Sequence, residues 1–373
     1  MKIEKINESE VEKLKKQKIM QKAGDIIKKG GLVAFPTETV YGLGADALNP
    51  LAAEKIYQAK GRPSDNPLIV HIADFESLSQ ITRELPWQAK KLADAFWPGP
   101  LTMILQKADC VPMQTTGGLD TVAVRMPAHK TALALIRAAG GFIAAPSANT
   151  SGRPSPTKAS HVAEDLDEKI DLLLDGGSVG IGLESTIVDL TEGKAVILRP
   201  GAIRAEMMED LIGEVTLDKA LFLRDDNIRP KAPGMKYKHY APKAEMYIVD
   251  GEEDKVINKI NDCVKQAIQE SYERLYDDEG DVFARIKILS ELETKIGILC
   301  CKENSGKYPY GIIKSIGSKQ NEQEIAANLY AALREFDGSQ VKLIYSESFY
   351  TPQMGDAIMN RLMKAAGQNL ISV

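Results

Sequence analysis

The chain has 373 residues, of which 44% are apolar and 27% are charged, and it carries a formal net charge of −5. This composition is typical of a globular protein and excludes wholesale disorder, and the length allows two hydrophobic cores. The charge excludes a global basic field, so any contact with nucleic acid would have to use a local patch.

The four cysteines show no CxxC spacing, which favours reduced thiols in a cytoplasmic protein and indicates no metal-ligating cluster. The N-terminus is charged and lacks an apolar signal region, and no run of residues approaches the length of a membrane span. We therefore expect neither secretion nor membrane insertion.

In chain order, Ser9 and Glu12 have the spacing of a capping box and open a helical region. A short apolar strand at 32–35 precedes a helix that begins after Asn49 and stops at Gly61. Further strands are expected at 68–72, 101–105, 121–127, 142–147, 172–175, 186–190 and 195–199, with helices at 74–96 and 130–139. This alternation predicts an α/β domain over residues 1–228, although periodicity does not fix which strands are parallel.

Residues 229–243, RPKAPGMKYKHYAPK, combine Lys and Arg with three prolines and no acid. Proline at this density predicts an extended segment between two domains. Tyrosines and a histidine between the cations leave two interpretations open, a plain linker or a functional one. After it, residues 244–373 repeat the alternation of strands and helices, which predicts a smaller, parallel-sheet α/β domain.

Two stretches near the start place polar groups beside apolar strands. In FPTETVYGLGADA, residues 35–47, a strand ends in hydroxyl groups and glycines, as a binding crevice requires, although an ordinary turn would look similar. In KGRPSDNPLIVHI, residues 60–72, Lys60 and Arg62 are either solvated or able to clamp a polyphosphate. His71 in the same stretch has the simpler interpretation of a core histidine.

Two later stretches suit an anionic ligand. Residues 144–157, AAPSANTSGRPSPT, offer small hydroxyl and amide groups after an apolar strand, and a serine-rich turn is the alternative. Arg125 and Arg199 lie in apolar strands, where a guanidinium is costly unless it meets an anion or an acid. No P-loop, GxSxG elbow or HExxH motif occurs, so we expect positioning and charge stabilisation without a covalent nucleophile.

Seven stretches in order resemble the YrdC-like domain of threonylcarbamoyl-AMP synthases, over about residues 18–205: PTETVYGLGADA, KGRPSDNPLIVHI, FWPGPLTMIL, TVAVRMPAH, PSANTSGRPSPT, ESTIVDL and ILRPGAI. The basic segment and the domain after it resemble the longer, two-domain form. The resemblance implies an open twisted α/β sheet around a large basic cavity, followed by a Rossmann-like domain. It implies a nucleotidyltransferase that forms threonylcarbamoyl-AMP and pyrophosphate from ATP with Mg²⁺, L-threonine and bicarbonate, for threonylcarbamoyladenosine modification of tRNA.

The resemblance also implies partners and site residues. A separate threonylcarbamoyl-transferase protein would act downstream, and a weak contact with tRNA is expected. The phosphate-facing tetrad falls on Lys60, Arg62, Ser147 and Asn149. Positions around threonine fall on Thr39, His71, Arg125, Ala145 (through its backbone) and Ser185. Further positions around the nucleotide fall on Asn66, Thr121, Ser155 and Arg199. Tyr240 is expected to close over the nucleotide, with Tyr237 as the alternative.

Two other classes of protein compete with this interpretation. The basic linker would also suit a protein that binds double-stranded RNA or the ribosome, with an affinity that depends on salt. A similar domain occurs in carbamoyl-transfer enzymes of hydrogenase maturation, but their zinc-finger modules have no counterpart here. We expect the linker and the second domain to act as a lid over the active site.

Overall fold

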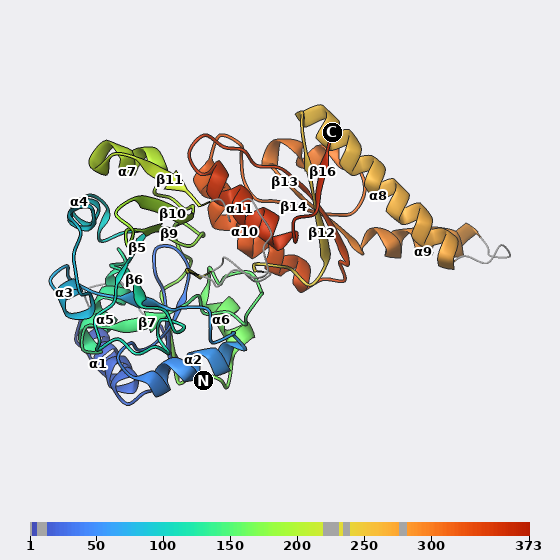
Figure 1. The fold of residues 1–373 in the computed structure, drawn as a ribbon. Helices are drawn as coiled ribbons and strands as arrows, with labels where there is room; N and C mark the ends of the chain where they lie inside the picture. Colours follow the sequence, from blue (N-terminus) through green and yellow to red (C-terminus); the bar gives the residue numbers. More distant parts are fainter. Residues whose placement is uncertain (1, 6–12, 219–230, 234–238, 276–281) are drawn as a thin grey trace. The chain divides into compact units, whose positions relative to one another are not determined.

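A computed structural model describes residues 2–5, 13–218, 231–233, 239–275 and 282–373 of the chain. The chain divides into two compact units, Met1–Tyr237 and Lys238–Val373 (Figure 1). This division falls inside the predicted linker at 229–243. The predicted capping box at Ser9 lies outside the described residues.

The first unit is built on a mixed sheet. Its strands are β1 (Lys2–Lys5), β2 (Val33–Phe35), β3 (Gly42–Asp46), β4 (Ile69–His71), β5 (Leu101–Gln106), β6 (Thr121–Arg125), β7 (Ile143–Ala145), β8 (Leu172–Asp175), β9 (Thr186–Asp189), β10 (Ala195–Arg199) and β11 (Val215–Leu217). Their order in space is β1-β8-β2-β3-β7-β4-β6-β5-β9-β10-β11. Parallel and antiparallel pairs alternate irregularly along this order, which periodicity alone did not predict.

The helices of the first unit begin and end where the local sequence requires. They are α1 (Lys13–Lys28), α2 (Pro50–Lys60), α3 (Leu78–Ile81), α4 (Trp87–Phe96), α5 (Lys130–Ala138), α6 (Ala159–Leu166) and α7 (Ala205–Ile212). In α2, the Asn49 side chain accepts hydrogen bonds from the amides of Leu51 and Ala52, and Gly61 ends the helix at a φ of 61°. The predicted helix at 74–96 is two helices, because Pro86 interrupts it before α4.

Strand β3 corrects the prediction that the glycines of residues 35–47 let a ligand approach the backbone. Residues 42–46 pair with β2 instead, and Gly44 lies opposite Val33. A Cβ atom on Gly44 would lie 2.8 Å from Ile143 Cγ2 and 2.9 Å from Phe35 Cε1. The glycine is therefore required by close packing against these side chains, and not by the approach of a ligand.

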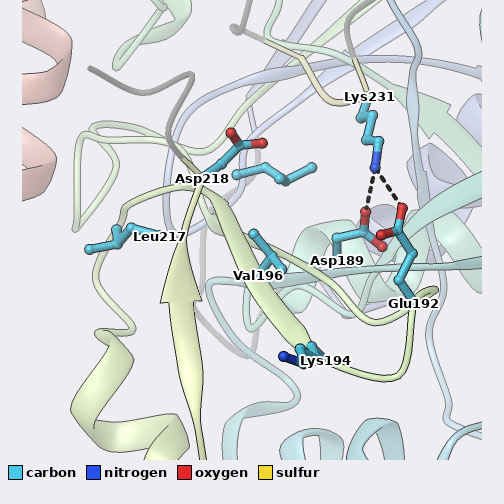
Figure 2. A pocket seen from close by; sticks show the side chains of 8 residues that line it. Asp189, Glu192, Lys194, Val196, Leu217, Asp218 and Lys231 are labelled. Carbon is cyan, nitrogen blue, oxygen red and sulfur yellow. Dashed lines mark hydrogen bonds and ion pairs between the residues drawn. The ribbon is translucent and has the colours of Figure 1, made fainter. Parts of the chain in front are cut away.

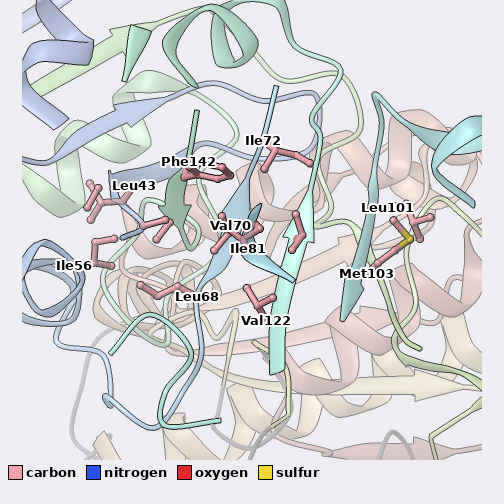
Figure 3. Packing of buried hydrophobic residues seen from close by; sticks show 14 of the residues in the cluster. Leu43, Ile56, Leu68, Val70, Ile72, Ile81, Leu101, Met103, Val122 and Phe142 are labelled. Atoms are coloured by element: carbon pink, nitrogen blue, oxygen red, sulfur yellow. The ribbon is translucent and has the colours of Figure 1, made fainter. Parts of the chain in front are cut away.

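The two faces of this sheet differ. One face buries the largest apolar cluster, which includes Leu43, Val70, Met103 and Val122 and packs against Ile56 of α2 (Figure 3). On the opposite face, α1 and α5 pack over β2, β7 and β8.

The rest of that opposite face carries a small aliphatic cluster. We call it the site face, and it is formed by Ile69 (β4), Ala123 (β6), Ile104 (β5), Ile187 (β9) and Leu198 (β10). Alternation along a strand puts residues two apart on the same face, so His71, Arg125 and Thr102 also belong to it.

The second unit is a parallel sheet with helices. Its strands are β12 (Glu245–Asp250), β13 (Ile296–Cys300), β14 (Ile312–Ser315), β15 (Leu343–Glu347) and β16 (Leu370–Ser372), in the order β14-β13-β15-β12-β16. Its helices are α8 (Glu253–Leu275), α9 (Val282–Glu293), α10 (Glu322–Asp337) and α11 (Gly355–Ala365), with a 3-10 helix at Lys302–Lys307. Every described pair of strands is parallel, which confirms the prediction. Among the described residues, no helix is both long and apolar enough to cross a membrane.

Candidate active site

Three residues of the predicted tetrad meet at the end of α2. Lys60 is buried, and its Nζ donates to the carbonyl oxygens of Ser147 and Asn149, both at 2.5 Å. The Ser147 hydroxyl donates to Asn149 Oδ1 at 2.5 Å. The interpretation of Lys60 as a solvated lysine is therefore wrong, because its ammonium group fixes the loop that follows β7.

Arg62 lies two residues further along the chain, beyond the end of α2, and is also buried. Its Nε donates to the carbonyl of Asn66 at 3.2 Å and its Nη2 to the carbonyl of Pro67 at 3.1 Å, which folds the guanidinium over its own loop. Asn66 is buried as well, and its Oδ1 has no hydrogen-bond partner among the described residues. A buried polar atom without a partner is unusual in a native protein and is typical of a site that receives a ligand.

Arg125 ends β6 on the site face and is the centre of a second polar group. Its Nη1 donates to Thr39 Oγ1 at 2.9 Å, its Nη2 to Glu38 Oε1 at 2.5 Å and its Nε to the carbonyl of Gly99 at 3.2 Å. Strand register puts Arg125 opposite His71 of β4 and opposite Thr102 of β5. The expectation that a strand arginine meets an acid or an anion is confirmed at this position.

His71 is buried beside Arg125 and is neutral. Burial, followed by the positive charge of Arg125, lowers the pKa of His71 to about 3. Its Nδ1 lies 3.0 Å from the carbonyl oxygen of Ile69, which can only accept, so Nδ1 carries the proton. The ring also meets Phe35 edge-on, with centroids 6.1 Å apart. His71 is thus packed like a histidine of the hydrophobic core, although its strand position places it on the site face.

Ser185 joins β5 to the second strand arginine. Its Oγ lies 2.7 Å from Thr102 Oγ1, and Arg199 donates to it from Nη2 at 3.1 Å and to its carbonyl from Nε at 3.0 Å. The register of β10 shifts between Ile197 and Arg199. Strict alternation would put Arg199 on the same face as Ile197, in the large apolar cluster, and the β-bulge turns it toward Ser185 instead.

Three predicted residues of the first unit remain: Ser155, Thr121 and Ala145. Ser155 is buried and donates to Glu184 Oε1 at 2.5 Å. Thr121 begins β6 and shares a face with Arg125 by alternation. Ala145 ends β7 opposite Ile69 of β4.

Tyr240 belongs to the second unit, and Tyr237 lies outside the described residues. Tyr240 is buried and stacks on Tyr330 with centroids 5.3 Å apart, and the Arg361 guanidinium lies 5.8 Å from its ring. A contact between Tyr240 and a nucleotide stays a prediction.

Sequence reasoning did not assign functions to Glu38, Thr102 and Glu184. Each lies within hydrogen-bonding distance of a predicted site residue: Glu38 of Arg125, Thr102 of Ser185, and Glu184 of Ser155. A buried arginine usually needs an acidic partner, and this rule could have pointed to Glu38, because Glu38 comes shortly after β2 and directly before Thr39. No comparable signal pointed to Thr102, because its place depends on the register of β5 against β6 and β9.

A pocket of about 330 Å³ lies beside the site face, between β10, β11 and residue 231 (Figure 2). Val196 and Leu198 contribute apolar side chains, and Lys231 lies 3.0 Å from Glu192 Oε1 and 3.7 Å from Asp189 Oδ2. The hydrogen bond to Glu192 raises the pKa of Lys231.

Each of residues 231–233 contacts β9, β10 or the side chains of the site face. Besides the ion pairs of Lys231, Ala232 is fully buried in the aliphatic cluster, and the Pro233 carbonyl accepts from Arg199 Nη1 at 3.4 Å. The start of the predicted linker is therefore more than a spacer, because it contacts a predicted site residue.

Taken together, the mixed α/β sheet, two buried cations beside a hydroxyl-rich loop, and two strand arginines are typical of the class of α/β proteins that bind anionic ligands. Residues 25–201 match the protein family described as "Telomere recombination", and residues 203–367 match the one described as "Threonylcarbamoyl-AMP synthase, C-terminal domain". The chain therefore belongs to the threonylcarbamoyl-AMP synthase family.

Relatives over nearly the full length agree with this assignment. The threonylcarbamoyl-AMP synthase of Pyrococcus abyssi is 47% identical, across 97% of this chain and 98% of its own, and that of Bacillus subtilis is 48% identical, across 94% and 93%. The solved structure of Pyrococcus abyssi Sua5 complexed with L-threonine superposes with a TM-score of 0.87 at 45% identity and covers 100% of both chains. A variant of that protein, in which a His and a Tyr are replaced by Ala, gives a TM-score of 0.86.

Proposed function

We propose that the chain is an L-threonylcarbamoyladenylate synthase, a nucleotidyltransferase that uses ATP, L-threonine and bicarbonate. The observation that carries the proposal is that this chain is similar to threonylcarbamoyl-AMP synthases over nearly its whole length and nearly theirs. One of the similar solved structures is of a complex with L-threonine. The neutral amine of threonine would capture CO₂ as a carbamate. A carbamate oxygen would then attack the α-phosphate of ATP, and pyrophosphate would leave.

We assign threonine to the Arg125 side of the site face. Arg125 and Thr39 would hold its carboxylate, since a guanidinium matches the planar geometry of a carboxylate. Ser185, His71 and the backbone of Ala145 would line the threonine side chain and its hydroxyl group. Fixing two reactants in an attack geometry can contribute about 7 kcal/mol or more to a reaction, so this positioning is a large part of the catalysis.

We assign the ATP phosphates to Lys60, Arg62, Ser147 and Asn149. Lys60 would act on the leaving pyrophosphate as a point charge while it fixes the loop that carries Ser147 and Asn149. The remaining nucleotide contacts would come from Asn66, Thr121, Ser155, Arg199 and one of Tyr240 or Tyr237. The unpartnered Oδ1 of Asn66 supports this, because it offers an acceptor to an amino or hydroxyl group of the nucleotide.

Mg²⁺ is proposed as part of the substrate, bound to the ATP phosphates. Among the described residues, no group of three or more His, Cys, Asp or Glu side chains could hold a metal ion. Mg²⁺ commonly keeps several waters and binds substrate phosphates with one or two carboxylates at most. The ion would neutralise charge on the leaving pyrophosphate.

The product would serve tRNA modification. A separate protein would transfer the threonylcarbamoyl group to the adenosine next to the anticodon, and a weak contact of this chain with tRNA would use the Lys and Arg residues of 229–243. The expectation of a lid formed by the linker and the second domain stays a prediction. A lasting RNA complex is not required for adenylate synthesis.

Pyrophosphate release from ATP by the purified chain tests the proposal. We expect release that requires both L-threonine and bicarbonate, and that proceeds in the absence of RNA. No release under any of these conditions, together with salt-sensitive RNA binding, would contradict the proposed function and favour an RNA-binding protein.

A further inference from the structure

Glu38 is a carboxylate paired with Arg125, and its second oxygen has no hydrogen-bond partner in the part of the chain that the structure describes. Its Oε1 accepts from Arg125 Nη2 at 2.5 Å, and its Oε2 is shielded from solvent and has no hydrogen-bond partner among the described residues. Leaving a buried acceptor unsatisfied costs free energy, more so for a charged group. Such a group in a native protein is therefore expected to have a function that the unliganded fold does not reveal.

The local fold holds Glu38 in a fixed turn. The Thr37 hydroxyl accepts from the amides of Thr39 and Val40 at 3.1 and 3.3 Å, and the Glu38 carbonyl accepts from the Ile181 amide at 2.8 Å. The carboxylate is ionised: burial, the largest single effect, would raise its pKa, but the charge and hydrogen bond of Arg125, together with the backbone amides of Glu38 and Ala128, lower the pKa overall. A fixed anion is thus paired with a fixed cation on the site face.

Arg125 does not need a full carboxylate from the protein for its own hydrogen bonds. The Thr39 hydroxyl and the Gly99 carbonyl already accept from it, and one neutral oxygen at the position of Glu38 Oε1 would complete the set. The negative charge of Glu38 therefore exceeds what Arg125 needs, and its Oε2 makes no hydrogen bond of normal geometry with the described residues, although the backbone amides of Glu38 and Ala128 also stabilise the carboxylate. They match a second cationic group that arrives with a ligand.

We propose that Glu38 recognises the α-ammonium group of the amino-acid substrate, while Arg125 takes its carboxylate. The inference rests on the proposed function and adds a specificity residue to it. An amino acid carries both charges on one carbon, and the Arg125–Glu38 pair presents the complementary charges side by side. When the substrate carboxylate shares Arg125, Glu38 gains the ammonium, so no buried charge is left without a counter-ion.

Glu38 acts in recognition and does not act as the base. A carboxylate beside an ammonium group favours the protonated amine, whereas the amine must be neutral when it meets CO₂. After the substrate has bound, the ammonium proton passes to bicarbonate, the co-substrate of the proposed reaction, which on protonation gives CO₂ and water. Glu38 selects amino acids against hydroxy acids of the same shape, because a ligand without the ammonium leaves Oε2 unpartnered.

The experiment compares two ligands on the full-length protein by titration calorimetry: L-threonine and its deaminated analogue, a hydroxybutanoate that keeps the carboxylate and the hydroxyl. Glu38→Gln keeps the shape and one oxygen for Arg125 but removes the charge. We expect Glu38→Gln to weaken L-threonine binding about tenfold to a hundredfold, the range for a hydrogen bond to a charged group, and to leave the affinity for hydroxybutanoate within about twofold.

Glu206→Gln, the same change at an exposed position of α7, is the matched control and should bind both ligands like the unmodified protein. Glu38→Asp retains the charge and is the second variant; it should keep part of the preference for L-threonine even if Glu38→Gln folds poorly. Thermal unfolding of each variant verifies that it is folded at the temperature of the titration.

Two results would overturn the inference while the proposed function stands. Equal weakening of both ligands by Glu38→Gln would mean that Glu38 only positions Arg125. Unchanged L-threonine affinity in Glu38→Gln would mean that the ammonium has another partner. Failure of the unmodified protein to bind L-threonine would instead contradict the proposed function itself.

Discussion

Replacing Lys60 by Met should destabilise the first unit as well as remove a charge from the candidate active site. The Lys60 ammonium donates to two carbonyls at 2.5 Å and is 2% exposed, so no water can take its place. A hydrogen bond to a charged group contributes about 1.5–3 kcal/mol, and losing the ammonium leaves both carbonyls of the loop after β7 unsatisfied. Because the variant also avoids the cost of burying a charge, we expect a net loss of about 2–4 kcal/mol.

The chain contains two tryptophans, and both belong to the first unit, which makes fluorescence a specific probe of that unit. Trp97 is buried and Trp87 is exposed. Urea unfolding followed by this signal measures the first unit even if the whole chain does not unfold in one step. Pyrophosphate release is then measured at a urea concentration of zero, where the variant is still folded.

Lys55→Met is the matched control. Lys55 lies on the same helix, α2, is exposed, and donates to a single carbonyl, that of Gly30, at 2.6 Å. Its loss should cost less than about 1 kcal/mol and leave turnover unchanged. If Lys60→Met were as stable as Lys55→Met, or folded and fully active, the assignment of Lys60 to both the loop and the phosphates would be wrong.

Three further predictions follow from contacts of single residues. Lys231→Met should raise the KM for ATP several-fold at low salt, because it releases the segment that contacts Arg199. Lys194→Met in the same pocket should leave the KM unchanged, and identical KM values for the two variants would contradict this prediction. The first unit should lose stability as pH falls from 6.5 toward 3, by up to about 1.4 kcal/mol per pH unit from His71 alone, because His71 binds a proton in the unfolded chain but stays neutral in the folded one. His71→Asn should reduce this dependence of stability on pH, and an unchanged dependence would exclude His71 as its source. Tyr308→Phe should lower the local stability of β13 by about 1–3 kcal/mol and so speed its amide hydrogen exchange, because the Tyr308 hydroxyl donates to buried Glu347 at 2.6 Å. Unchanged exchange would show that this hydrogen bond is not stabilising.

Local signals in the sequence predicted much of the fold. Asn49, Pro50 and Gly61 mark the two ends of α2, because a side-chain cap, a fixed φ and a left-handed residue are local requirements. Strand β3 could not be predicted in the same way, since Gly44 is explained by packing against Phe35 of the preceding strand and against Ile143, which is distant in the sequence. The strand order was also inaccessible, because decisive pairings such as β1 with β8 and β3 with β7 join segments far apart in the sequence.

The candidate site divides in a similar manner. A buried arginine in an apolar strand requires a counter-ion, so Arg125 was predictable from its surroundings, and its acid proved to be Glu38. The meeting of Lys60 with Ser147 and Asn149 was reached from the family resemblance, since the residues are almost ninety positions apart. Arg199 reaches Ser185 through a β-bulge, and nothing in the alternation of AVILR indicates a bulge.

The identity of the product tests the central claim most directly. Purified protein would be incubated with ATP, L-threonine and isotopically labelled bicarbonate, and the nucleotide products would be separated and weighed by mass spectrometry. The account predicts an adenylate that contains threonine and one labelled carbon, formed in equal amount with pyrophosphate. Pyrophosphate formed without that adenylate, or an adenylate of threonine that lacks the label, would contradict it.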